Sequence, residues 1–78
     1  MITANTLKTL TTFTAPALTK AIQLAGYKKD KFNTAEFVGM TNAGQFCYKV
    51  TYTEHEAEQT GKVFLSYDPV AGKVSADY

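Results

Sequence analysis

The 78-residue sequence has no arginine, no tryptophan, a single cysteine and two prolines. One thiol, Cys47, cannot form a disulfide within the chain, which excludes the cross-linked framework of small secreted domains. No apolar run approaches the roughly 18 residues of a membrane span, so we expect no membrane insertion. Threonines interrupt every apolar run near the N-terminus, and no signal peptide is expected there. The sequence therefore predicts a cytoplasmic protein.

The sequence does contain enough apolar material for one domain, predicted over residues 1–78. Hydrophobic residues make up 45% of the chain, and there are five tyrosines and five phenylalanines. This composition argues against a disordered tail, which would be poor in aromatic residues. All eight basic residues are lysines, and seven acidic residues leave a formal net charge of +1. The charge balance is typical of a solvated surface and does not favour a strongly charged partner.

Helical spacing of apolar residues is confined to the first third of the chain. Pro16 is compatible with the first turn of a helix, and Thr14 before it is suited to the N-cap. Gly26 is suited to the position just after a helix end, so a helix is predicted over 15–25. A shorter, threonine-rich helix is expected over 4–13. A single long helix kinked at the proline is the alternative.

From residue 32 onward the apolar period changes to two, as in β-strands. The clearest run, 45–54, places Phe, Tyr, Val and Tyr on one face and polar or small residues on the other. A three-residue hairpin loop is predicted at 42–44, and a turn with Pro and Gly at 68–72. The predicted strands cover residues 35–41, 45–54, 62–67 and 73–78.

These elements predict an α+β fold, with an N-terminal helix, kinked or split at Pro16, packed on a four-stranded antiparallel β-meander. The aromatic face of the sheet needs the apolar side of the helix as its cover. The opposite face, which includes Cys47 and Lys49, can face water. Phe64 falls on this polar face. It is a contact surface, a side chain packed under a loop, or a sign that the predicted register is shifted by one residue.

The densest cluster of titratable groups is the segment 54–58, in which glutamates flank a histidine. A zinc site needs about three or four N or S ligands, and one imidazole does not supply them. A catalytic Cys47 would need an activating base, but His55 lies about 26 Å away along an extended strand. We therefore interpret 54–58 as a charged hairpin loop, and expect no metal, no cofactor and no enzymatic activity.

One basic cluster is present, formed by Lys28, Lys29 and Lys31. Arginine, which reads phosphates and guanine through its planar fork, is absent. The tyrosines that could stack on bases share the face that the helix must cover. Nucleic-acid binding through this cluster is kept as the alternative function.

Two stretches, Tyr48-Lys49-Val50-Thr51-Tyr52 and the segment 63–74 ending in Gly72-Lys73-Val74, carry a resemblance to a known family. Together they resemble the PepSY family of small α+β modules, in which a helix precedes a three-stranded meander with a turn of this kind. The resemblance covers roughly residues 17–78 and implies the topology. It also implies export or membrane attachment and protease inhibition, whereas this sequence shows no export signal.

We expect the protein to be non-enzymatic and to act by contacting another protein. The candidate contact residues are Phe64, Phe32 and Tyr78, and the candidate nucleic-acid contacts are the three lysines above. The edge strand over 73–78 could pair with a partner or with a second copy in a two-fold homodimer. The small size and absence of catalytic residues are also typical of phage or mobile-element accessory proteins and inhibitors.

Overall fold

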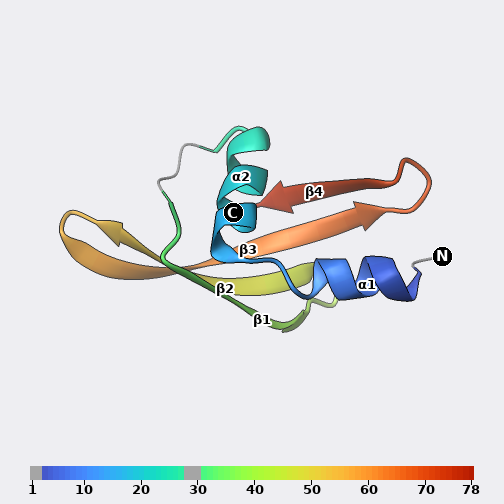
Figure 1. Cartoon of the computed structure of the whole chain (residues 1–78), viewed down its shortest axis with the longest axis horizontal. Helices are drawn as coiled ribbons and strands as arrows, with labels where there is room; N and C mark the ends of the chain where they lie inside the picture. The colour runs from blue at the N-terminus through green and yellow to red at the C-terminus, as the bar shows by residue number, and fades with distance from the viewer. Residues whose placement is uncertain (1–2, 28–30) are drawn as a thin grey trace.

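The computed structural model describes residues 3–27 and 31–78, in which two helices precede a four-stranded sheet (Figure 1). The strands are antiparallel and lie in the order β1-β2-β3-β4. This arrangement confirms the predicted α+β fold and the predicted meander. The elements are α1 (Ala4–Leu10), α2 (Ala15–Leu24), β1 (Thr34–Met40), β2 (Phe46–Glu54), β3 (Ala57–Asp68) and β4 (Lys73–Asp77).

Two separate helices form, so the alternative of one kinked helix is wrong. Thr3 caps α1 by accepting a hydrogen bond from the Thr6 N–H at 3.2 Å. Helix α2 begins after the extended residue Thr14, has a proline in its first turn and ends at Leu24, close to the predicted boundaries. After α2, the backbone N–H groups of Gly26 and Tyr27 donate to carbonyl groups in the last turns of the helix. Neither described helix is long and apolar enough to cross a membrane.

The β2–β3 hairpin differs from the prediction. Strand β3 begins at Ala57, not at residue 62. The two-residue turn His55-Glu56 connects the strands, and β3 pairs with β2 without interruption from Ala57 onward. Both turn residues have positive φ, +52° and +63°, as the tight hairpin turns require. The stretch 57–61, exposed except at the half-buried Gly61, lacks apolar alternation, so its sequence gives no strand signal. The hairpin extends beyond the helices and gives the molecule a long axis of 43 Å (Figure 1).

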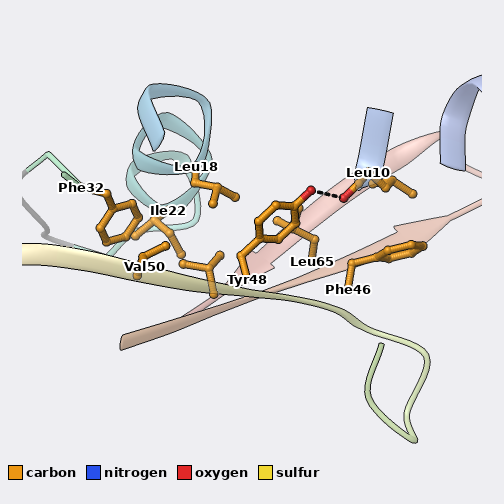
Figure 2. Packing of buried hydrophobic residues seen from close by; sticks show 9 residues of the cluster. Leu10, Leu18, Ile22, Phe32, Phe46, Tyr48, Val50 and Leu65 are labelled. Atoms are coloured by element: carbon orange, nitrogen blue, oxygen red, sulfur yellow. Dashed lines mark hydrogen bonds between the residues drawn. The ribbon is translucent and has the colours of Figure 1, made fainter. Parts of the chain in front are cut away.

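The hydrophobic core lies between α2 and the middle of the sheet (Figure 2). Three elements contribute side chains that are completely buried: Leu18 and Ile22 from α2, Tyr48 and Val50 from β2, and Val63 and Leu65 from β3. This confirms the predicted inward face of β2 and the predicted register of β3.

Phe32 is also part of the core. The prediction that it is an exposed contact residue is wrong, because its side chain is completely buried. Its backbone N–H donates to the Thr19 hydroxyl at 3.0 Å, and that hydroxyl donates to the carbonyl of Ala15 at 2.9 Å. Thr19 therefore satisfies a buried backbone donor and ties the chain before β1 to α2.

Cys47 corrects a second expectation, since it lies on the sheet face opposite the helices and is nevertheless buried. Its partners in the neighbouring strands are Gly39 and Phe64. Two residues directly opposite each other on neighbouring strands lie close enough for one side chain to cover the other. We infer that the Phe64 ring shields the thiol on a face that otherwise carries polar residues.

Candidate docking groove

A groove separates α1 from the end of the sheet where β1 turns into β2. It is open to solvent, has a volume of about 550 Å³ and is mainly apolar. Figure 1 shows α1 beside this end of the sheet, away from α2. The groove is lined by Ala4, Leu7, Lys8 and Thr11 from α1 and the following turn, and by Phe37, Gly39, Met40 and Phe46 from the strands.

The α1 wall of the groove is attached to the sheet by Tyr48. The Tyr48 hydroxyl donates to the carbonyl of Leu10, the last residue of α1 (Figure 2), and accepts from the Phe13 N–H at 3.0 Å. The rings of Phe13 and Tyr48 meet edge to face, with centroids 6.1 Å apart. Burial raises the pKa of the Tyr48 phenol above its ordinary value. One side chain near the start of β2 therefore attaches the end of α1 to the sheet.

The floor of the groove consists of aromatic residues from the first hairpin. Phe37 is half-buried, and its ring centroid lies 6.2 Å from that of Phe46 and 5.4 Å from that of Tyr48. Met40 and Leu7 at the rims remain 56% and 46% exposed. Apolar side chains on both sides of the groove are therefore left without a complete cover.

A β-bulge shapes the sheet side of the groove. The register between β1 and β2 shifts between Phe37 and Gly39, so Val38 is the additional residue. Gly39 has a φ of +141°, a conformation that residues with a side chain rarely adopt. A bulge bends an edge strand locally, and here the bend lies directly at the groove.

The electrostatic character of the groove depends on one residue. Among the described side chains that line it, Lys8 alone carries a charge. Glu36 of β1 is paired with Lys49 on the opposite face of the sheet, and the two charges face away from α1. The groove therefore combines an apolar floor with a positive charge at its α1 rim.

Phe64 and Tyr78, predicted as contact residues, lie elsewhere. Phe64 is half-buried on the sheet face opposite the helices, which removes the alternative of a shifted register. The Tyr78 ring stacks on Phe32 with centroids 5.9 Å apart and also contacts Tyr52. Burial, with a hydrogen bond to Tyr52, raises the pKa of Tyr78. Tyr78 thus closes one end of the core, although it stays partly accessible.

The charged groups singled out from the sequence are not brought together with the groove. Lys28 and Lys29 lie outside the described residues, and Lys31 is exposed. His55 is exposed at the far tip of the β2–β3 hairpin, with its Nε2 3.7 Å from the Glu54 Oε1. Within 3–27 and 31–78, no three or more His, Cys, Asp or Glu side chains gather in a group that could hold a metal ion.

Sequence reasoning missed the groove residues Leu7, Phe37 and Met40. Leu7 and Leu10 are three residues apart within the helix expected over 4–13, and that spacing predicts burial of both. Only the position of α1 at the end of the sheet separates them, with Leu10 inside and Leu7 at the rim. The available signal was the short length of the threonine-rich helix, because a two-turn helix cannot cover the width of a sheet.

No protein-family model matches the chain, and no curated protein or solved structure matches it significantly. The resemblance to the PepSY family therefore stays a prediction of topology.

Proposed function

We propose that this chain is a non-enzymatic binding protein that contacts another protein through the groove between α1 and β1. The supporting observation is the apolar surface left uncovered there, where Leu7 and Met40 are about half exposed on either side of the half-buried Phe37. Apolar side chains scattered singly over a surface need no explanation, but a group of them in one groove is typical of an interaction site.

A protein partner fits this groove better than a small molecule does. Pockets for small ligands usually bury most of the ligand surface, whereas this groove is open to solvent. A partner chain brings its own apolar surface and covers the rims as well as the floor. The same proposal includes regulation or inhibition of that partner. It places the protein in a reducing cytoplasm, where Cys47 stays a thiol. It also includes an origin among phage or mobile-element accessory proteins.

Site-specific photo-crosslinking tests the proposal. A photo-crosslinking amino acid replaces Leu7 in one variant and Val70 in the matched control. Val70 is 95% exposed in the β3–β4 turn and is not among the residues that line the groove. In cells that naturally make the protein, we expect a discrete adduct with one protein from position 7 and none from position 70.

The adduct has to be validated with the purified partner. We expect Leu7→Asp to weaken its binding by roughly tenfold or more, and Val70→Asp to leave it unchanged, because a charge in an apolar contact is unfavourable. Equal crosslinking from both positions, or undiminished binding by Leu7→Asp, would contradict a groove-mediated function. Circular dichroism of each variant checks that it is folded.

A further inference from the structure

The two edges of the sheet differ in how well they are protected. Strand β4 has five residues and charged residues at both ends. The hydroxyl of Tyr27, which follows α2, donates to the Asp77 carboxylate and crosses to this strand. Short, charged and covered edges are the usual protection against pairing with another chain. β4 is protected in all three ways.

Strand β1 is less protected, since it is longer and its β-bulge affects only its last residues. It has seven residues, pairs with β2 on one side and has no strand on its other side in the described sheet. Its single charged residue is Glu36, and its exposure alternates strictly between exposed and half-buried along the strand. An edge of this kind presents backbone N–H and C=O groups that an added strand can pair with.

The open edge and the apolar groove are continuous. Phe37, Gly39 and Met40 belong to β1 and also line the groove, and α1 forms the opposite wall. A strand added to β1 at the usual spacing of about 4.8 Å would direct every second side chain toward the α1 side of the sheet. Those side chains would contact the exposed faces of Leu7 and Met40.

The bulge limits where such a strand can pair. Residues Thr34–Phe37 form an uninterrupted ladder with β2, and the register then shifts before Gly39. A partner strand can therefore pair regularly with about four residues before the edge bends at the groove. Because this ladder is short, the affinity and the register of the added strand depend on its side-chain contacts in the groove as well as on its backbone hydrogen bonds.

We propose that the groove receives an extended segment of the partner protein that adds to β1 as a fifth strand. Alternate apolar side chains of the segment fill the groove, and an acidic side chain pairs with Lys8. The inference rests on the proposed function and specifies the partner class. The unpaired edge favours a strand over a helix, since a helix already satisfies its own backbone groups and cannot use those of β1. The lone positive charge at the rim favours an acidic residue over a basic one.

A peptide-display selection on the folded protein is the first experiment. A library of random linear peptides is selected on the wild-type protein and depleted on the Leu7→Asp variant, with Val70→Asp as the matched control. We expect enriched peptides with apolar residues at every second position and an Asp or Glu beside them. Apolar spacing of three or four residues would indicate a helix and would overturn the strand.

Backbone methylation of one enriched peptide is the decisive measurement. In an added strand, alternate amides point toward β1 and the others point to solvent. N-methylation at the first set should weaken binding roughly two- to tenfold at each position, and the second set provides the built-in control. Equal effects at all positions, or no effect at any position, would overturn the strand geometry.

A charge exchange tests the contact with Lys8. We expect Lys8→Glu to weaken binding of the acidic peptide roughly two- to fivefold, and a Lys in place of the peptide acid to restore binding to that variant. Lys20→Glu on the exposed side of α2 is the matched control. Unchanged affinity for Lys8→Glu would remove the acidic residue from the proposal.

The result also separates this inference from the proposed function. A groove-specific crosslink without any enriched extended peptide overturns the strand and leaves protein binding intact. Absence of both the crosslink and the peptides overturns both. A dimer in light scattering that Leu7→Asp abolishes would assign the groove to a second copy of the chain and overturn the extended segment.

Discussion

The two helices cover the sheet to different extents. On α2, Leu18 and Ile22 are completely buried, and the helix closes the core over the middle of the sheet (Figure 2). On α1, Leu10 is completely buried but Leu7, one turn earlier, is 46% exposed. Apolar residues at helical spacing, four apart in α2 and three apart in α1, therefore produce a closed interface in one helix and an open groove in the other.

The difference follows from length and attachment. Helix α2 has ten residues and a hydroxyl, Thr19, that binds the backbone of Phe32. Helix α1 has seven residues and is attached to the sheet at its last residue through Tyr48. A short helix attached at one end covers only the part of the sheet near that end. Helix α2 therefore contributes more of the buried surface that stabilises the fold, whereas α1 leaves the proposed docking groove open.

Matched leucine truncations test this division most strongly. We expect Leu18→Ala to destabilise the protein by about 2–5 kcal/mol, because it leaves a cavity in a completely buried site. Leu7→Ala should cost less than about 1 kcal/mol, since nearly half of that side chain is already exposed. Urea unfolding followed by circular dichroism measures both. Similar losses for the two variants would mean that α1 is as important for stability as α2.

Removing one hydroxyl tests the attachment of α1. We expect Tyr48→Phe to lower the free energy of unfolding by about 1–3 kcal/mol, because a buried donor–acceptor group bound to Leu10 and Phe13 is lost. The variant should also weaken binding at the groove, whose α1 wall depends on this contact. Unchanged stability and unchanged binding would show that α1 is positioned by its other contacts.

The same tyrosine predicts a loss of stability in alkali. Burial raises the pKa of Tyr48 in the folded state above its value of about 10 in the unfolded chain. The folded protein then retains the proton that the unfolded chain loses, so the free energy of unfolding decreases as the pH rises above about 10. Urea unfolding at several alkaline pH values should show a shallower decrease for Tyr48→Phe. An equally steep decrease in that variant would assign the effect to other groups.

A close contact on the α2 side of the molecule gives a smaller effect. A Cβ at Gly61 would lie 2.5 Å from the Tyr78 hydroxyl oxygen and 3.2 Å from the Tyr52 Cε1. We expect Gly61→Ala to destabilise the protein by about 1 kcal/mol, as overpacking outweighs the reduced entropy of the unfolded chain. In a Tyr78→Leu background, the same substitution should become neutral or stabilising. Equal effects in both backgrounds would show that the Tyr78 ring does not restrict this position.

The smallest effect concerns the sheet face that no helix covers. Cys47 is 8% exposed beside Phe64, and we expect Phe64→Ala to increase its rate of reaction with a thiol reagent several-fold. The free energy of unfolding should change much less than in Leu18→Ala. Val70→Ala, in the exposed β3–β4 turn, is the control. An unchanged rate would mean that Gly39 and the backbone, and not Phe64, shield the thiol.

The strands show how far local sequence patterns could predict this structure. The alternation around Tyr48 and Val50 predicted the inward face of β2, and the loop at 42–44 was confirmed by the Thr41–Gln45 hydrogen bond across it. The start of β3 was missed because residues 57–61 pair with β2 although they show no alternation of apolar and polar residues. Strand pairing there depends on closure of the hairpin, which the propensities of single residues do not encode.

The groove was beyond prediction for a related reason. Leu7 belongs to a helical segment whose spacing predicts burial. Phe37 and Met40 are three residues apart, so a period of two would place them on opposite faces of the sheet, and only the bulge at Val38 brings both to the α1 side. Phe32 failed in the opposite direction, since it was named as a surface contact residue and is completely buried. Burial of a residue outside a regular pattern depends on which element packs above it, and for Phe32 this is decided by Thr19 and Tyr78.

The sequence alone determined the fold class, the inward aromatic face and the two turns that carry Gly, because alternation, helical spacing and turn residues act within a few positions of the chain. Tertiary structure alone decided that Leu10 is buried and Leu7 is not, that Phe32 joins the core, and that β1 keeps an open edge beside a groove. Each of these depends on where a whole helix or strand lies relative to another. That position is set by the summed burial of many side chains and by single long-range contacts such as the Tyr48 hydroxyl on Leu10.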